Sequence, residues 1–252
     1  MFQRMRELEY DYIVTGHYAR VEYDEKRDRY LLKKAVDDTK DQSYVLYMLT
    51  QEQLAHVKLP LGGLRKDQVR VIAEKHGFIN ARKHDSQDIC FVPDGDYAKF
   101  IEKYTGKKTP EGDFVDKEGN YIGRHKGIIH YTIGQRRGLG IPAASRLYVC
   151  EISPKTNTVV LGDNADLFSS ELEADSVNLI SVDCLAEPKR VTAKIRYRHK
   201  EQPATAWQTP DGILHVKFDE PQRAITKGQA VVMYDGDEVV GGGVINKIYS
   251  QS

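Results

Sequence analysis

One cysteine of this sequence has the surroundings of a reactive thiol. Cys90 lies in the segment 85–91, shortly after the basic run Arg82-Lys83-His84. Positive charge nearby favours the thiolate, the form that attacks electrophiles and accepts sulfur. The apolar residues on either side of Cys90 also allow it to be a small buried hydrophobic residue. Cys150 falls in an alternating strand pattern and Cys184 in a loop, so Cys90 is the one candidate nucleophile.

A second candidate site follows a short apolar run near the N-terminus. The run Tyr12-Ile13-Val14 ends at Thr15-Gly16-His17-Tyr18. Parallel α/β sheets present ligands where a strand breaks at such a turn, and Gly16 would let the backbone approach a ligand closely. His17 allows two interpretations, an acid–base group or a simple turn residue.

A third candidate is the tetrapeptide Lys40-Asp41-Gln42-Ser43, which precedes a predicted helix. An acid followed by an amide and a hydroxyl at a helix start is typical of an N-cap, worth on the order of 1 kcal/mol. The functional alternative is that Lys40 and Gln42 meet the phosphates and base edges of an RNA.

The charge of the whole chain does not indicate a nucleic-acid-binding protein, because 37 basic residues balance 37 acidic ones. Local runs of basic residues are more informative about nucleic-acid binding, because such patches can neutralise phosphates even on a neutral protein. The alternative is that each run is a solvated face. The runs are Lys33-Lys34, Arg124-x-Lys126, Arg136-Arg137 and Lys194-x-Arg196-x-Arg198-His199-Lys200. In the last run Lys194, Arg196, Arg198 and Lys200 alternate along a predicted strand, so their side chains are expected to share one face and to follow a phosphate backbone.

The elements expected around these residues form three regions. Residues 1–92 alternate helix and strand, with helices expected at 2–9, 42–57 and 66–76 and a hairpin of 18–23 with 30–34. Only one convincing parallel strand is present there, so we expect this region to be the C-terminal part of a larger α/β domain.

The other two regions are a connector and a barrel. Residues 93–165 predict a small mixed connector domain, with a helix at 96–104 and a hairpin of 147–152 with 158–161. Residues 166–252 predict a closed antiparallel β-barrel of short strands joined by tight turns. Its strands are expected at 191–197, 204–209, 213–218, 230–234 and 239–245.

Composition excludes several classes of protein. The mean hydropathy is −0.55 and no run of about 18 apolar residues occurs, which argues against a membrane protein. Three cysteines without a C-x-x-C pair argue against a disulfide framework or a structural zinc site, and no metal ligand set is identified. We therefore expect a cytoplasmic protein in a reducing compartment.

Five ordered motifs resemble those of the tRNA-specific 2-thiouridylase family. They are Thr15-Gly16-His17-Tyr18, Lys40-Asp41-Gln42-Ser43, Asp85-Ser86-x-x-Ile89-Cys90-Phe91, Gly134-Gln135-Arg136-x-Gly138-Leu139-Gly140 and Gly241-Gly242-Gly243. The resemblance implies a PP-loop domain that uses ATP and Mg²⁺ to adenylate the wobble uridine of a tRNA. A cysteine persulfide, loaded by a cysteine desulfurase or a sulfur carrier protein, then displaces AMP to give 2-thiouridine.

The resemblance also implies roles for individual residues. Cys90 is similar to the persulfide-bearing cysteine of the family, and Gly16 to its adenosine-contacting glycine. The residues similar to its tRNA contacts are His17, Lys40, Asp41, Gln42, Arg196, Tyr197 and Gln229.

Two features of the family do not occur in these 252 residues. They contain neither the Ser-Gly-Gly-x-Asp-Ser loop that cradles the nucleotide phosphates nor a second cysteine in an Asp-x-x-Cys-Asn setting. We therefore expect this chain alone to bind ATP weakly and to be inactive, as part of a tRNA sulfurtransferase. The alternative is a non-catalytic, truncated tRNA-binding module. A methyltransferase is disfavoured, because no Gly-rich nucleoside-binding motif follows a strand.

Overall fold

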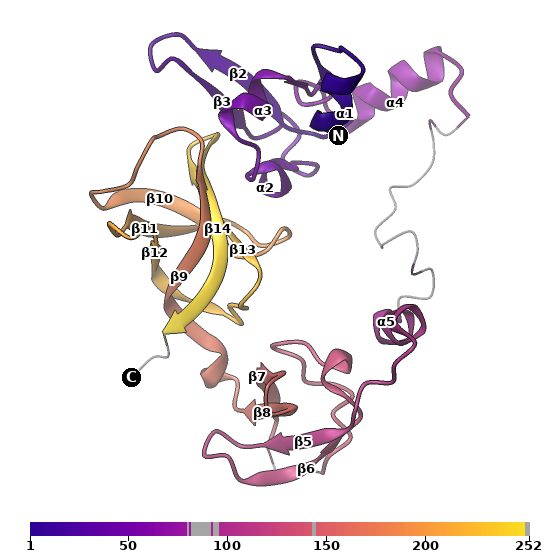
Figure 1. Ribbon diagram of the computed structural model, residues 1–252, viewed down its shortest axis with the longest axis vertical. Coiled ribbons are helices and arrows are strands. Elements are labelled where there is room, and N and C mark those ends of the chain that lie inside the picture. Colours follow the sequence, from indigo (N-terminus) through magenta and orange to yellow (C-terminus); the bar gives the residue numbers. More distant parts are fainter. Residues whose placement is uncertain (80, 82–91, 93–95, 143–144, 250–252) are drawn as a thin grey trace. The chain divides into compact units, whose positions relative to one another are not determined.

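The computed structural model describes residues 1–79, 81, 92, 96–142 and 145–249 (Figure 1). These residues form two compact units. The first contains the described residues of 1–83, 170–220 and 226–249, and the second those of 84–169 and 221–225.

The N-terminal part of the first unit is an α/β layer built on two short parallel strands. β1 (Ile13–Val14) pairs with β4 (Val57–Lys58), with Ile13 opposite Val57. The helices beside them are α1 (Phe2–Glu7), α2 (Ser43–Leu46), α3 (Gln51–Ala55) and α4 (Lys66–Lys75). α4 ends where predicted, at Gly77, whose φ of +71° lies in the left-handed region that glycine adopts readily.

The single helix predicted over 42–57 is wrong, because the chain breaks it into α2 and α3. Thr50 starts a new helix with a capping box, in which its hydroxyl accepts from the Gln53 N–H and the Gln53 side chain accepts from the Thr50 N–H. Val57, expected at the helix end, instead belongs to the second parallel strand, which the sequence analysis did not identify.

The predicted hairpin is present as β2 (Arg20–Asp24) and β3 (Arg29–Lys33). Its turn is held by Asp24, whose carboxylate accepts from the backbone N–H groups of Lys26 and Arg27. The hairpin extends the sheet of the barrel, since Lys33 pairs with Glu238 on β14.

The C-terminal part of the first unit is a barrel that six antiparallel strands close within the described residues. The strand order is β13-β10-β11-β12-β9-β14, and pairing of β14 with β13 completes the ring (Figure 1). The strands are β9 (Phe168–Leu179), β10 (Lys189–Lys194), β11 (Gln202–Gln208), β12 (Leu214–Arg223), β13 (Ala230–Asp235) and β14 (Glu238–Tyr249). The barrel was predicted, but its strand β9 was not.

One strand boundary corrects a prediction about charge. β10 ends at Lys194, and the chain then turns, with the His199 N–H donating to the Arg196 carbonyl at 3.1 Å. The basic residues of 194–200 therefore do not alternate along a strand or share one strand face. The pairing of β10 with β13 ends at Lys194, opposite Val232, and the backbone groups beyond it are used by the turn instead of by a neighbouring strand.

The α/β layer and the barrel share a hydrophobic core. Tyr44, Tyr47 and Leu54 pack in one cluster with barrel residues such as Ile180 and Val232. Gly242 on β14 makes this approach possible, because a Cβ there would lie 2.7 Å from Cδ2 of Tyr47 and 2.5 Å from the carbonyl oxygen of Val231. The terminal glycine motif thus has a packing role in this structure.

The second unit contains a four-stranded sheet with the order β6-β5-β8-β7, in which β5 and β8 run parallel. Its elements are α5 (Tyr97–Thr105), β5 (Gly112–Val115), β6 (Tyr121–His125), η1 (Ile128–His130), β7 (Tyr148–Ser153), β8 (Thr158–Gly162) and η2 (Ala165–Leu167). The predicted helix and the 147–161 hairpin are confirmed. Phe114, Val149 and Val159 form the centre of its core.

No helix in the described part of the chain is both long enough and apolar enough to cross a membrane.

Candidate functional site

Three segments that are distant in sequence meet beside the barrel. They are the start of α2, the turn after β10 and the turn that leads into β13. The Tyr44 ring lies 6.1 Å from the Tyr197 ring, and the Tyr44 hydroxyl donates to the Ala230 carbonyl at 2.9 Å. Nη2 of Arg196 donates to Oγ1 of Thr226 at 3.2 Å. These contacts bring most of the predicted RNA-contacting residues together.

Residues on the exposed side of this cluster have the properties of a recognition surface. Tyr197 is 41% exposed, and Arg198 and Gln229 are exposed. Burial lowers the pKa of His199, and the charges of Arg196 and Lys194 lower it further, so this imidazole is neutral at pH 7. The segment 196–199 therefore presents an aromatic ring and guanidinium charge side by side, which suits a stacked base and a phosphate.

Gln42 ties the start of α2 to the turn that follows β1. Its backbone N–H donates to the Tyr18 carbonyl at 2.8 Å, and its side-chain oxygen accepts from the Tyr18 N–H at 3.0 Å. The adjacent His17 is half-buried, with Nδ1 2.8 Å from the Thr15 hydroxyl. The carboxamide oxygen of Gln42 is thus engaged within the chain, while its NH₂ group remains the part able to read a base.

Asp41, one of the predicted RNA contacts, has a side chain only 5% exposed. Its Oδ1 accepts from the N–H groups of Ala35 (3.0 Å) and Ser43 (3.2 Å), and its Oδ2 accepts from the Ser43 hydroxyl (2.8 Å). The N-cap residue is Gln42, whose side chain makes no capping hydrogen bond, so the acid of the tetrapeptide accepts from the first turn of α2 from one position earlier. Asp41 shapes the segment that carries Lys40 and Gln42.

A cluster of largely buried charged side chains packs against the start of α2 and the end of β10. Lys194 (15% exposed) lies 3.8 Å from Asp41 and 3.7 Å from Glu201. Glu201 also pairs with Lys34 at 2.8 Å, and both lysines lie over the ring of the fully buried Tyr234. Burial raises the pKa of Tyr234, so its hydroxyl stays protonated. Lys194 is a structural cation here, a role the alternating pattern did not reveal.

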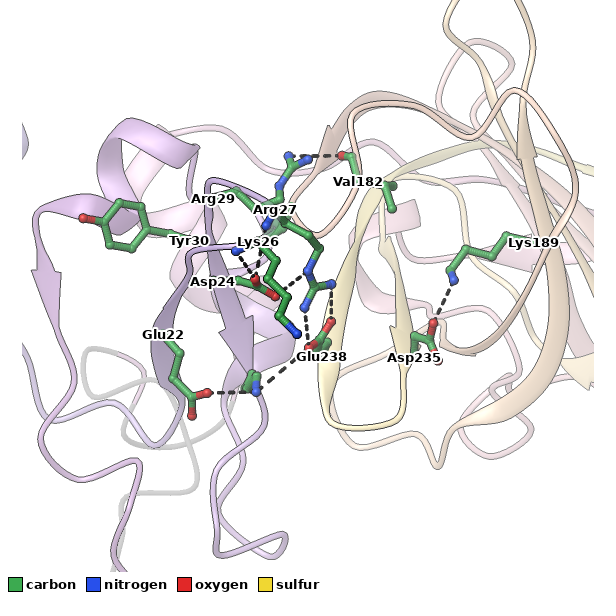
Figure 2. A network of polar contacts seen from close by, with 12 residues as sticks. Glu22, Asp24, Lys26, Arg27, Arg29, Tyr30, Val182, Lys189, Asp235 and Glu238 are labelled. Atoms are coloured by element: carbon green, nitrogen blue, oxygen red, sulfur yellow. Dashed lines mark hydrogen bonds and ion pairs between the residues drawn. The ribbon is translucent and has the colours of Figure 1, made fainter.

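Ion pairs at the hairpin fix the α/β layer against the barrel (Figure 2). Arg27 binds Glu238 through two hydrogen bonds of 2.9 Å and also contacts Asp24 at 2.6 Å. Lys33 pairs with Glu22 at 2.8 Å and lies 3.9 Å from Glu238. These contacts lie beside the point where β3 meets β14, at the pair Lys33 and Glu238.

The predicted sulfur-carrying residue, Cys90, lies outside the described residues. Burial raises the pKa of the Cys150 thiol to about 11, and Asp166 adds to this shift. Cys150 is therefore a protonated, unreactive thiol at neutral pH. Cys184 is exposed in the loop after β9.

Gly16 is exposed at the end of β1. A Cβ at this position would meet only Cδ1 of Leu61 at 3.6 Å, an ordinary contact. The packing of the chain therefore does not require a glycine at this position. Without a side chain, the exposed backbone leaves room for the close approach of a planar group such as a nucleoside. A separate cleft of about 640 Å³ lies between the β2–β3 hairpin and residues 54–60. None of the described candidate residues lines that cleft.

Three contributors to the site were missed by sequence reasoning. Tyr44 and Thr226 anchor the converging segments, and Glu201 joins the two lysines beneath them. The partners of Tyr44 and Thr226 lie 186 and 30 positions away, so no local pattern marked either residue. Among the described residues, no group of three or more His, Cys, Asp or Glu side chains could hold a metal ion.

Comparison with family models supports the order of domains. A model described as the tRNA methyl transferase HUP domain matches residues 1–94. The tRNA methyl transferase PRC-barrel domain matches residues 98–163, and the aminomethyltransferase beta-barrel domain matches residues 169–245. The predicted order of an α/β domain, a connector and a barrel is confirmed.

Curated relatives are similar to the chain along almost its whole length. The tRNA-specific 2-thiouridylase MnmA of Clostridioides difficile is 56% identical over 246 residues, covering 98% of this chain and 68% of the relative. That of Acetivibrio thermocellus is 54% identical over 245 residues, covering 97% and 68%. MnmA 1 of a Thermoanaerobacter species is 56% identical over 236 residues, covering 94% and 65%. These relatives bear the name of a thiouridylase, whereas the family models carry that of a methyltransferase. At such identity, the chain belongs to the tRNA-specific 2-thiouridylase family.

Proposed function

We propose that this chain acts in the 2-thiolation of the wobble uridine of tRNA, and that the surface described above binds the tRNA. In this proposal His17, Lys40, Gln42, Arg196, Tyr197 and Gln229 contact the nucleic acid. Asp41 acts indirectly, by holding Lys40 and Gln42 in place.

The observation that carries the proposal is the convergence of three segments. Lys40–Gln42, Arg196–Tyr197 and Gln229 come from three separate parts of the sequence, yet contacts of Tyr44 and Arg196 tie their segments together. A surface that joins exposed guanidinium, amide and aromatic groups is suited to phosphate contacts and base stacking.

The chemistry of the reaction needs two further groups. ATP would supply the activation of the uridine oxygen, and Gly16 offers room for its adenosine side, as the open backbone there indicates. The phosphates and Mg²⁺ would need a Gly-rich loop such as the PP-loop, which these 252 residues do not contain. We also propose that Cys90 carries the sulfur as a persulfide, supplied by a cysteine desulfurase or sulfur carrier protein in the cytoplasm.

A salt titration of tRNA binding tests the interface. We expect Arg196→Ala to weaken binding of a tRNA transcript with uridine at the wobble position, and to lower the slope of log affinity against log salt by about one. Arg190→Ala is the matched control, because Arg190 is exposed on β10 but pairs with Asp219 at 2.7 Å. Equal affinities and slopes for wild type and Arg196→Ala would remove this surface from the tRNA interface.

A second experiment tests the sulfur step. In an enzyme that includes a PP-loop segment, Cys90→Ser should abolish 2-thiouridine formation while leaving tRNA affinity nearly unchanged. Normal thiolation by this variant would contradict the assignment of Cys90. If thiolation persists while Arg196→Ala still weakens binding, the tRNA interface stands without the proposed sulfur carrier.

A further inference from the structure

One sequence motif has no role in the site described above. It is the loop Gly134-Gln135-Arg136-Arg137-Gly138-Leu139-Gly140 of the second unit. The side chain of Gln135 closes this loop, since its oxygen accepts from the Thr132 N–H at 3.0 Å and its NH₂ group donates to the Arg137 carbonyl at 2.9 Å. Gly134, Gly138 and Gly140 all have positive φ angles, of 86°, 78° and 73°. The loop thus has a defined, tightly turned conformation.

The loop is also anchored to the body of the second unit. The Gly134 N–H donates to the Val149 carbonyl at 2.8 Å, and the Val149 N–H donates to the Gln135 carbonyl at 2.9 Å. Apolar side chains on both sides of the tip, including Ile133 and Leu139, pack against the core around Phe114. Arg136 and Arg137 are exposed at the tip between these anchors. The backbone that carries these two arginines therefore needs little ordering when a ligand binds.

The segment that carries this loop contains no acidic residue. From position 119 to 150 the sequence has five Lys or Arg residues and no Asp or Glu, although the average of 37 acidic residues in 252 would place about five there. Its arginines differ in pairing. Arg124 pairs with Asp113 at 3.1 Å, whereas Arg136 and Arg137 form no ion pair within the described residues.

A third guanidinium lies beside the loop. Arg223 donates from Nη2 to the Gly134 carbonyl at 3.5 Å and from Nε to Oδ1 of Asn164 at 3.2 Å, and it lies over the Tyr148 ring at 5.4 Å. These partners are all neutral. By contrast, eight other arginines in the described part of the chain pair with carboxylates, namely Arg4, Arg6, Arg20, Arg27, Arg29, Arg65, Arg124 and Arg190.

We propose that Arg136 and Arg137, supported by Arg223, bind backbone phosphates of the tRNA. This inference rests on the proposed function, because tRNA is the polyanion the chain would meet. Guanidinium groups match phosphate oxygens with two parallel hydrogen bonds, and unpaired like charges on a fixed loop repel each other until an anion neutralises them. An acidic protein is the competing partner, but a polynucleotide presents phosphates at the regular spacing that adjacent arginines can follow.

The test is a salt titration of tRNA binding by residues 1–252 carrying Arg136→Ala and Arg137→Ala together. Two lost phosphate contacts should lower the salt slope by about 1.4–1.8, which corresponds to roughly 25- to 60-fold weaker binding at 0.1 M salt. Lys107→Ala with Lys108→Ala is the matched control, since this exposed pair in the same unit removes the same charge. The control should change the slope by less than about half a unit.

Each outcome decides the inference. Lysine at both positions should retain most of the slope, which separates charge from a folding defect, and far-ultraviolet circular dichroism checks that the alanine variant is folded. An unchanged slope in the alanine variant, while Arg196→Ala lowers it, would overturn the loop contact and leave the proposed function intact. If neither variant changes tRNA binding, both proposals are wrong. Equal losses of salt slope in the alanine variant and in the lysine-pair control would show that the loop contributes only nonspecific charge, which would overturn the proposed phosphate contacts.

Discussion

Replacing Asp41 by Asn distinguishes a positioning role from a direct contact with tRNA. The carboxylate accepts three hydrogen bonds, from the backbone of Ala35 and from both the backbone and the hydroxyl of Ser43, and lies 3.8 Å from Nζ of Lys194. The Asn oxygen can keep the two backbone bonds. The new NH₂ group, however, would face the Ser43 hydroxyl and the Lys194 ammonium, with no negative charge to offer either.

The magnitude follows from these contacts. Hydrogen bonds to a charged group contribute roughly 1.5–3 kcal/mol and neutral ones about 0.5–1.5 kcal/mol, so weakening each of the two backbone bonds by about 1 kcal/mol and losing the charged hydroxyl bond together cost about 3–5 kcal/mol. We expect Asp41→Asn to lower the free energy of unfolding by that amount in urea titrations. tRNA affinity should fall up to about tenfold, a loss of about 1.4 kcal/mol in binding free energy, because Lys40 and Gln42 lose the carboxylate that positions them.

Asp38→Asn is the matched control, because Asp38 is exposed in the same loop and removes the same charge. It should leave the free energy of unfolding unchanged within about 0.5 kcal/mol. A carboxylate that touched the tRNA directly would repel phosphates, so its neutralisation would alter affinity without altering stability. Unchanged unfolding of Asp41→Asn together with changed tRNA affinity would therefore refute the positioning role.

Three further predictions follow from the contacts of the two units. Arg27→Glu should place a carboxylate against Glu238 and lower the free energy of unfolding by about 1 kcal/mol, and adding Glu238→Arg should recover part of it, as a double-mutant cycle in urea would measure. Leu54→Ala, at a fully buried position between α3 and the barrel, should cost about 3 kcal/mol; a loss below about 1 kcal/mol would show that the shared core is not tightly packed. The pKa of Cys150 is raised to about 11, so in a Cys90→Ser background this thiol should react with iodoacetamide at pH 8 far more slowly than the exposed Cys184. Its rate should rise as the pH approaches 11, and equal rates for the two thiols at pH 8 would contradict the burial of Cys150.

Sequence periodicity predicted the barrel and the hairpins because their signals are local. β11 alternates inward Ala204 and Ala206 with more exposed neighbours, and the Asp24-to-Asp28 turn carries its own hydrogen-bonding side chains. The break between α2 and α3 depended on the capping box of Thr50, which lies inside a continuous helical pattern. Strand β4 has only two residues and is defined by its pairing with β1, which no pattern within it reveals.

The candidate site could be predicted in its residues but not in its geometry. Motif resemblance selected Gln42 and Asp41, yet the use of their side chains inside the chain became visible only through partners such as Tyr18 and Ala35. The end of β10 at Lys194 depends on where its pairing with β13 stops and on the hydrogen bond that closes the following turn, neither of which a residue pattern reveals. The alternating charges that followed were therefore misassigned to one strand face.

The four basic runs show why charge patterns alone could not separate recognition from support. In the first run, Lys33 and Lys34 pair with Glu22 and Glu201, the second of which lies 167 positions away. Lys194 in the last run likewise lies close to two carboxylates, those of Asp41 and Glu201. A run looks the same in sequence whether or not such distant partners exist.

Pairing with carboxylates is thus the property that divides these cations by role. A paired cation is already neutralised and would have to lose its partner before it bound a phosphate, whereas an unpaired one gains its first counter-charge from the ligand. Within the described residues, Arg136 and Arg137 form the run in which neither member forms an ion pair. Their substitution should therefore change the salt dependence of tRNA binding, while substitution of the paired Lys33 should change stability instead.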